Sequence, residues 1–280
     1  LTLPIIIGGL TDESAERASE FWKNTINVET IIVNSAETSE FVKLANNAWI
    51  DLNIALAHDL ARLSDTLEHD IDIIEVISAA NSLKKGNSNV NILAPSNGVG
   101  GYCLTKDPWF LYTLGKEKGI ELETIKSGRV SNDIMPEHSS QKIINFFNKS
   151  KKNLSKIKIA ILGLSFKSNS GDIRFTPVLP FIEKMKKAGF ENFSYFDDLV
   201  TSNDLKKMNI KTNKYILDTI KGADCIVFMA AHNEILNLKI EDIANYSNDS
   251  ALIFDGRRYF TRHEIDQIKK LNLNYTGIGR

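Results

Sequence analysis

The segment from Asn97 to Asp107, NGVGGYCLTKD, brings together residue types that can do chemistry. Its glycines let the backbone adopt positive φ and approach a ligand closely, and their amides can form a nest for an anion. Cys103 follows the glycines, and Lys106 and Asp107 come three and four residues later. Because backbone amides and a lysine stabilise a thiolate, the segment predicts a nucleophilic cysteine beside a close-fitting ligand.

A lone cysteine is more often a small buried side chain than a nucleophile. Cys225 fits that description, because it lies in the mostly apolar run Ala223–Phe228. The glycines and charges around Cys103 favour the nucleophile there. The chain has only two cysteines, in unlike surroundings, which argues against a disulfide framework and for a reducing compartment, with the cytoplasm as the default.

Lys43 and Asn47 are one helical turn apart, so both side chains can point at one spot from a rigid element. Such a pair on its own is more often solvent-exposed than functional. In the sequence FVKLANN of residues 41–47, however, polar groups sit beside an apolar stripe, which favours a functional pair.

Basic residues follow two apolar runs of the C-terminal half. Gly163 ends one such run, with Lys167 and Arg174 shortly after it, and Arg257 follows another. If these runs are parallel strands, the cations lie at the carboxyl edge of the sheet, where ligands bind, and they suit a phosphate. Solvated surface charge is the alternative. The glycine pattern is not GxGxxG, so no dinucleotide fingerprint is predicted here.

The composition and the residue spacing argue against several classes of function. The 34 Lys and Arg against 35 Asp and Glu give a net charge of −1, which leaves no global excess of positive charge for nucleic acid or an anionic membrane. No apolar run approaches the ~18 to 20 residues that span a bilayer, and the start lacks a signal peptide's basic region. The five histidines show no metal-ligand spacing, so no metal is predicted.

The elements that must position these residues fall into two kinds. Apolar residues at helical spacing predict helices over 11–25, 35–64, 70–83, 107–118 and 122–148, after an initial strand at 5–9 and another at 29–33, with a bend or break at Pro136. The Gly-, Asn- and Ser-rich stretch 84–101 is too long for a mere connection and predicts a functional loop.

After a polar linker at 150–156, short strands alternate with helices. Strands are expected at 157–162, 192–195, 224–229 and 251–255, with helices near 177–188, 214–220 and 262–271. Strands that read as continuous apolar runs between helices indicate an open parallel sheet. The fold class is therefore α/β, with an all-helical central part followed by a Rossmann-like parallel-sheet domain.

Four segments together resemble the UDP-glucose/GDP-mannose dehydrogenase family. They are Phe41–Asn47, Gly98–Phe110, Gly163–Pro177 and Asp255–Arg257, in the order and spacing of that family across essentially the whole chain. The stretch from Val90 to Pro95 is most similar to the branch that oxidises UDP-N-acetylhexosamines, especially UDP-N-acetyl-mannosamine 6-dehydrogenases. The sequence CLTKD of residues 103–107 resembles the UDP-glucose branch as closely, and Asn89 stands where the N-acetylhexosamine branch commonly has Arg.

The family oxidises the C6 hydroxyl of a nucleotide sugar to a carboxylate with two NAD molecules. The resemblance implies that Cys103 forms a thiohemiacetal and then a thioester, that Lys43 and Asn47 stabilise the oxyanion, and that Asp107 orients Lys43 or the hydrolytic water. It assigns contacts with the UDP-sugar to Gly100, Gly101, Phe166, Lys167 and Arg257, and a contact with NAD to Arg174.

The resemblance also implies an organisation. Residues 1–34 are expected to be the remnant of an N-terminal NAD-binding domain, 35–150 a central helical dimerisation domain and 151–280 a Rossmann-like UDP-sugar-binding domain. The helix over 35–64 would form the core of a homodimer. The chain would then be the C-terminal portion of a cytoplasmic enzyme of polysaccharide biosynthesis, and inactive with NAD on its own.

Other functions remain open. A UDP-glucose 6-dehydrogenase differs only in the sugar. A β-hydroxyacid dehydrogenase also uses a Lys-x-x-x-Asn pair, but it performs one oxidation without a thiol, which Cys103 in its glycine frame opposes. A UDP-sugar-binding or dimerisation module without catalysis is the third alternative, favoured by the missing dinucleotide fingerprint and opposed by the retained catalytic residue types.

Overall fold

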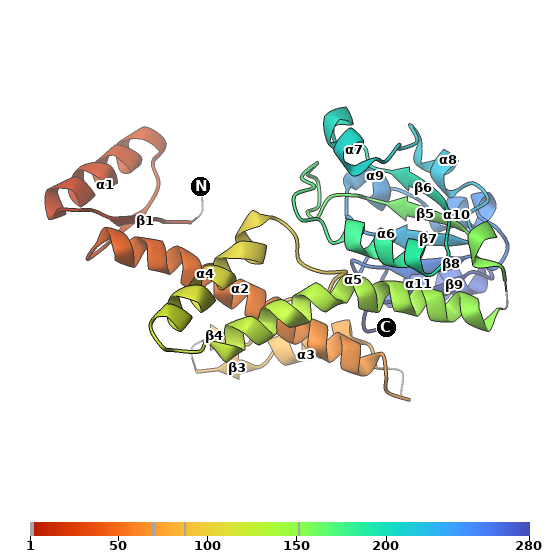
Figure 1. Ribbon diagram of the computed structural model, residues 1–280, viewed down its shortest axis with the longest axis horizontal. Helices are drawn as coiled ribbons and strands as arrows, with labels where there is room; N and C mark the ends of the chain where they lie inside the picture. The colour runs from red at the N-terminus through yellow and green to blue at the C-terminus, as the bar shows by residue number, and fades with distance from the viewer. Residues whose placement is uncertain (1–2, 69–70, 87, 151) are drawn as a thin grey trace.

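The computed structural model describes residues 3–68, 71–86, 88–150 and 152–280. Along its longest axis, a small β1–α1–β2 unit is followed by the helices α2 to α5 and then by an α/β region around a five-stranded sheet (Figure 1). The predicted helix start at Asp70 and part of the linker predicted at 150–156 lie outside the described residues.

The N-terminal unit pairs β1 (Ile5–Gly8) in parallel with β2 (Thr30–Val33), joined by α1 (Asp12–Ile26). Thr11 accepts a hydrogen bond from the amide of Ser14 and forms a capping box with it, which fixes where α1 begins. Ile31 and Ile32 of β2 are exposed.

Four helices and one small hairpin form the helical region. The helices are α2 (Ala36–Ser64), α3 (Ile73–Asn81), α4 (Tyr102–Glu117) and α5 (Glu123–Lys149), and the hairpin pairs β3 (Lys84–Lys85) with β4 (Ser88–Asn89). The 29-residue α2 confirms the long helix expected over 35–64, with Ser35 as its cap.

Two predictions about these helices need correction, namely the start of α4 and the break that was expected at Pro136 as the alternative to a bend. α4 begins at Tyr102 rather than at Asp107, because Gly101 leaves the extended loop with φ of 84° and its amide donates to the carbonyl of Arg174. α5 runs through Pro136 without a break. Packing of the buried Met135 and Pro136 between neighbouring elements outweighs the local cost of a proline in a helix.

The α/β region has five parallel strands in the order β6-β5-β7-β8-β9. They are β5 (Lys158–Leu162), β6 (Asn192–Phe196), β7 (Cys225–Phe228), β8 (Leu252–Asp255) and β9 (Asn274–Gly277). The first four confirm the predicted strands to within about two residues. β9 was not predicted, because its sequence NYTG at the sheet edge is neither apolar nor β-branched throughout.

Among the described residues, six helices and one 3-10 turn accompany the sheet. They are η1 (Leu154–Lys156), α6 (Val178–Lys187), α7 (Ser202–Met208), α8 (Ile216–Ile220), α9 (Asn233–Leu236), α10 (Ile240–Tyr246) and α11 (Arg262–Lys270). α6, α8 and α11 were predicted. The others escaped prediction because such short helices have too few turns for a periodic pattern.

The strand order reverses between β5 and β7, so the carboxyl ends of these strands flank a crevice. Gly163 turns the chain there with φ of 89°, and a Cβ at this position would lie 2.5 Å from the Cβ of Ala230. Only glycine fits this turn without moving the chain. In open α/β sheets, ligands bind at such a switch point.

The helical and α/β regions share one apolar core. A single cluster of buried side chains includes Ala57 and Ala61 of α2, Ile143 of α5 and Ile159 and Val227 of the sheet. Figure 1 shows α5 lying along the α/β region next to α6. The backbone also joins them, because the amide of Ile73 donates to the carbonyl of Gly279.

A buried polar network lies between α2 and α5. Arg129, 1% exposed, donates to Asp51 at 2.6 Å and to Asp133. The amide group of Asn132 donates to the Asp51 carboxylate at 2.7 Å, and its oxygen meets Nδ1 of His58 at 2.8 Å. Burial raises the pKa of Asp51, while the charge of Arg129 and its hydrogen bond act to lower that pKa. Charged groups that are removed from water in this way need all of these partners.

The hydrogen bonds assign the tautomer of His58. The amide of Ser96 donates to Nε2, so Nδ1 must carry the proton that it donates to Asn132. Burial lowers the pKa of His58 from 6.5 to about 3. The imidazole is therefore neutral in the folded protein at neutral pH.

We expect His58 to make folding pH-dependent. Its pKa is lower in the folded than in the unfolded protein, so the unfolded chain binds more protons between pH 6.5 and about 3. The free energy of unfolding should therefore fall by about 2 kcal/mol between pH 7.5 and pH 5 through this group alone. Urea unfolding at both pH values measures this change in the free energy of unfolding.

In His58→Gln, the difference in the free energy of unfolding between pH 7.5 and pH 5 should be smaller by that amount. The exposed His263 supplies the matched control, because His263→Gln should leave the difference unchanged. An equal pH dependence in His58→Gln and the wild-type chain would contradict the expectation.

Candidate active site

Lys43, Asn47 and Asp107 form one hydrogen-bonded row between α2 and α4. Nζ of Lys43 donates to Oδ1 of Asn47 at 3.3 Å, and Nδ2 of Asn47 donates to Oδ2 of Asp107 at 2.5 Å. Asn47 and Asp107 are buried, whereas Lys43 is exposed. Lysine has three donors and the Asn amide two, so each keeps at least one for a ligand oxygen.

Cys103 is the second residue of α4 and is exposed. The first amides of a helix have no intrahelical acceptor and carry partial positive charge, so they can donate to an anion beside this residue. Asp107 lies one turn further along the same face, so the thiol and the Lys43–Asn47–Asp107 row belong to one side of α4. Cys225, in contrast, is fully buried, and burial raises the pKa of its thiol.

The two glycines before α4 make room for Phe166. A Cβ on Gly100 would lie 2.4 Å from the Cβ of Phe166, and one on Gly101 would lie 2.7 Å from its Cζ. The positive φ of Gly101 adds backbone strain for any other residue. The glycines thus bring the cysteine-bearing helix and the loop after β5 into direct contact.

A cavity of about 220 Å³ lies where these two segments meet. Four residues predicted to contact substrate line it, namely Gly100, Phe166, Lys167 and Arg257. The rest of the lining consists of Ile54, Ala94, Pro95, Ser96, Gly98, Val99, Leu104 and Arg258. Lysine and two arginines give this cavity a positive wall that suits an anion.

Arg257 is held in place from three sides. Asp255 accepts from its amide, and the guanidinium donates to the carbonyls of Met229 at 2.9 Å and Phe166 at 2.7 Å. Burial lowers the pKa of Arg257 to about 10, so it keeps its charge at neutral pH. The turns after β5, β7 and β8 are thereby joined at the switch point.

Arg174 lies outside this cavity. Its exposed guanidinium pairs with Asp172 at 2.5 Å and lies over the Tyr102 ring, and the pair lowers the pKa of Asp172. Its carbonyl accepts from Gly101, which places it beside the start of α4. The structure thus brings nine of the ten predicted site residues into two adjoining groups and leaves Arg174 at their edge.

The structure gives contacts to two residues for which the sequence predicted no role, Asn97 at the start of the glycine-rich segment and Ser96 before it. Asn97 is fully buried, its amide donates to the carbonyl of Gly256 and its side chain donates to that of Pro177. Ser96 lines the cavity. The only sequence signal was the Asn-Gly dipeptide of residues 97 and 98, which marks a turn but no contact.

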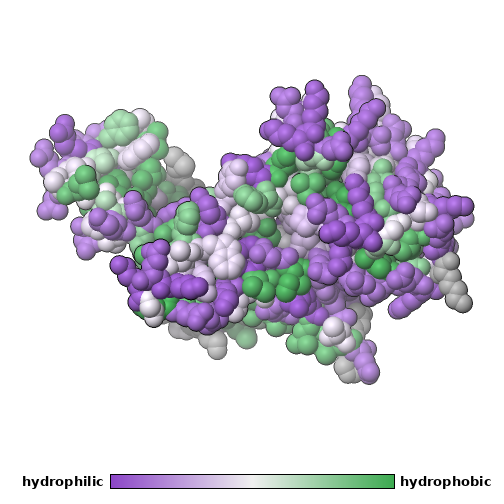
Figure 2. Space-filling model, viewed as in Figure 1, coloured by the Kyte–Doolittle hydropathy of each residue, from purple (hydrophilic) through white to green (hydrophobic). Residues whose placement is uncertain are grey.

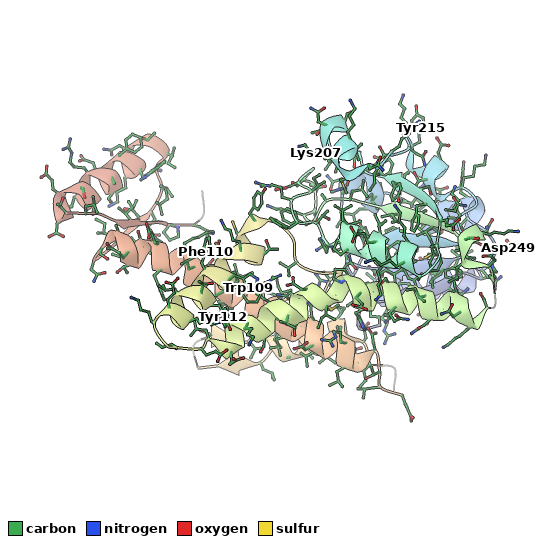
Figure 3. The ribbon with its side chains drawn as sticks, in the orientation of Figure 1. Trp109, Phe110, Tyr112, Lys207, Tyr215 and Asp249 are labelled. Atoms are coloured by element: carbon green, nitrogen blue, oxygen red, sulfur yellow. The ribbon has the colours of Figure 1, made fainter. Side chains whose placement is uncertain are left out.

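A larger cavity of about 740 Å³ lies on the other side of α4. Tyr102, Lys106 and Trp109 of α4 line it together with Pro136 of α5 and Pro180 of α6. Figure 3 shows Trp109 on α4, in the middle of the molecule. In the space-filling view the outline is hollowed between the N-terminal unit and the α/β region (Figure 2).

Every helix in the described ranges is too short or too polar to span a lipid bilayer. No group of three or more His, Cys, Asp or Glu side chains in the same ranges is placed to hold a metal ion.

The fold and the site residues define a class. Family models of the UDP-glucose/GDP-mannose dehydrogenase family match the chain twice, with the central domain at residues 37–134 and the UDP binding domain at residues 160–262. The chain belongs to the UDP-glucose/GDP-mannose dehydrogenase family.

Two of the similar proteins are UDP-N-acetyl-D-mannosamine dehydrogenases. The UDP-N-acetyl-D-mannosamine dehydrogenase of Methanocaldococcus jannaschii is 34% identical over 92% of this chain and 55% of its own length. The solved structure of the UDP-D-ManNAc dehydrogenase from Pyrococcus horikoshii superposes with a TM-score of 0.82 at 29% identity, over 98% of this chain and 59% of that one.

A third relative acts on a different N-acetylated sugar. The NDP-N-acetyl-D-galactosaminuronic acid dehydrogenase of Methanosarcina mazei superposes with a TM-score of 0.85 at 29% identity, over 98% of this chain and 57% of that one. The chain thus spans a little more than half the length of these relatives.

Proposed function

We propose that the protein oxidises C6 of a UDP-N-acetylhexosamine, such as UDP-N-acetyl-mannosamine, to the uronate. The observation that carries the proposal is the positively charged cavity between Gly100 and Phe166, next to the exposed Cys103 of α4. The names of the relatives support the N-acetylated sugar.

We assign binding of the nucleotide sugar to the cavity of about 220 Å³ that Lys167 and Arg257 line. Lys167 and Arg257 offer cationic donors to a diphosphate, and Phe166 offers an apolar face. Because Gly100 and Gly101 have no side chains, Phe166 packs directly against the backbone before Cys103, which brings the cavity wall at Gly100 and Phe166 next to the start of α4. This arrangement would present C6 of the sugar to the thiol.

The chemistry at Cys103 takes two oxidations. The C6 hydroxyl first loses a proton and a hydride to give the aldehyde, which the thiolate attacks to form a thiohemiacetal. Loss of a second hydride gives a thioester, and water releases the carboxylate and the free thiol. Lys43 and Asn47 would donate hydrogen bonds to the oxyanions that develop, and Asp107 would orient Lys43 through Asn47 or position the water.

NAD would accept the hydride in each oxidation. Among the described residues, the exposed Arg174 fits a contact with a phosphate of the dinucleotide, because its guanidinium is fixed by Asp172 and Tyr102 at the edge of the site. The turn after β5 has no GxGxxG fingerprint. We therefore propose that this chain alone does not turn over NAD and that residues 1–34 belong to a larger NAD-binding domain.

The same proposal includes an oligomeric state and a cellular location. Trp49 and Leu56 of α2 are exposed and border a further cavity with Val90 and Ile92. A homodimer through α2 would cover these side chains, in keeping with the length of that helix. The proposed enzyme works in the cytoplasm and supplies uronates for polysaccharide biosynthesis.

The test is turnover by the product of the complete gene that encodes this chain. We expect two NADH for each uronate formed, with UDP-N-acetyl-mannosamine preferred over UDP-glucose, and no NADH from the 280-residue chain alone. A preference for UDP-glucose would select the alternative dehydrogenase. Absence of NADH with every UDP-sugar would overturn the proposal and leave a binding module.

A further inference from the structure

We propose that Arg129, held by Asp51 and Asp133, is a positioning residue that makes Cys103 reactive. It sets the first turns of α4 and, through the chain Asp51, Asn132 and His58, the glycine loop of residues 96–101. This proposal deepens the proposed function, because it rests on Cys103 being the site's nucleophile. Asp51, His58, Arg129 and Asn132 do not line the cavity that holds Lys167 and Arg257, whereas Arg129 and Asn132 line the larger cavity beside α4. Toward the proposed sugar site, each of the four therefore acts through another group.

Arg129 supplies a hydrogen bond that α4 cannot make for itself. In an α-helix the carbonyl of Leu104 would accept from the amide of residue 108, but that residue is Pro108, which has no N–H. Nη1 of Arg129 donates to the Leu104 carbonyl at 3.3 Å instead. Leu104, whose carbonyl accepts this hydrogen bond, directly follows Cys103.

The same network reaches the glycine loop at its other end. Asn132 contacts His58, and Nε2 of His58 accepts from the amide of Ser96 at 3.1 Å. The hydroxyl of Ser96 then donates to the carbonyl of Gly98 at 3.0 Å. Both segments that flank Cys103 are thus fastened to one buried set of side chains.

Stability alone is a poor explanation for this network. A buried ion pair often stabilises a fold no better than apolar side chains of the same size would. Nε of Arg129 and Oδ2 of Asp51 are buried without a hydrogen-bond partner, which is costly. The two hydrogen bonds that leave α2 and α5 go to the carbonyl of Leu104 on α4 and to the amide of Ser96 in the glycine loop, which positioning of these segments explains.

A second ion pair between α5 and the end of α2 provides a matched control. Lys142 of α5 pairs with Asp65, the C-cap residue of α2, and donates to the carbonyl of Gly277, far along the helices from Cys103. Each pair joins an α5 cation to a buried carboxylate in α2 or at its C-cap. Only the Arg129 pair touches α4.

The two cysteines let one experiment separate positioning from folding. Cys103 is exposed and Cys225 is fully buried, so native-state alkylation by iodoacetamide reports the site at Cys103 and unfolding at Cys225. Because Cys103 is already exposed, loosening of the first turn adds no access. It removes the fixed amides that favour the thiolate, so the reaction slows.

We expect Arg129→Met to slow alkylation of Cys103 at pH 7 by about threefold or more, with Cys225 still protected. Lys142→Met should leave the Cys103 rate unchanged, and Arg129→Lys, which keeps one donor for Leu104, should recover part of the lost rate. If Arg129→Met unfolds the chain, the double variant Asp51→Asn with Arg129→Met removes both charges and is measured in its place.

Equal Cys103 rates in the Arg129 and Lys142 variants, with Cys225 protected in both, would overturn the proposal. The same holds if Arg129→Lys recovers nothing relative to Arg129→Met. Alkylation needs neither sugar nor NAD, so a failed turnover assay leaves this comparison intact, and the two proposals fail separately.

Discussion

Replacing Cys103 with serine should abolish uronate formation by the complete protein, with a loss of about a thousandfold or more in turnover. Serine keeps the size of the side chain, but its hydroxyl is not ionised beside the helix amides as a thiol can be. The aldehyde then has no thiol to trap it, and the second oxidation has no thiohemiacetal to act on. Mass spectrometry of the sugar product and NADH counting measure both steps.

Cys225 supplies the control for this substitution. Its thiol is fully buried in β7, so Cys225→Ala should lower the thermal stability and leave the two-NADH stoichiometry unchanged. Four-electron oxidation retained in Cys103→Ser would refute the role of the thiol.

Replacing Lys43 with methionine should lower kcat by about a hundredfold to a thousandfold with little change in KM. The ammonium group would stabilise charge that develops only in the transition state, and it also donates to Asn47. Methionine keeps the apolar stem, so the long helix α2 should fold normally. Steady-state kinetics with the preferred UDP-sugar checks the split between kcat and KM.

Lys207 is a matched exposed lysine. It pairs with Asp204 on α7, on the outer side of the α/β region and away from α4 (Figure 3). Lys207→Met should therefore leave both kinetic constants unchanged. A rise in KM with normal kcat in Lys43→Met would assign Lys43 to substrate binding instead of catalysis.

The sequence predicts well those features that repeat along the chain. The apolar stripe of α2 and the apolar runs of β5, β7 and β8 repeat over enough residues to reveal a helix and strands. Clustering of Gly100 and Gly101 with Cys103 also marked the site. The roles assigned to these site residues stay predictions.

Features that depend on a single distant contact could not be predicted. The start of α4 depends on a hydrogen bond from Gly101 to Arg174, 73 residues later in the chain, and the repair of Leu104 depends on Arg129. The apolar pattern predicted helix on both sides of Pro136, but nothing in the local sequence says that the helix passes this proline unbroken, or that α4 begins well before Pro108. A partner from elsewhere in the fold decides each case.

The glycine loop is fastened to both regions that meet at the cavity. Asn97 ties it to Gly256 and Pro177 of the α/β region, while Ser96 ties it to His58 of the helical region. Together with the shared apolar core, these bonds join the two regions at the cavity. A ligand therefore meets a preformed wall here, and the entropy of shaping this half of the site is lost during folding rather than during binding.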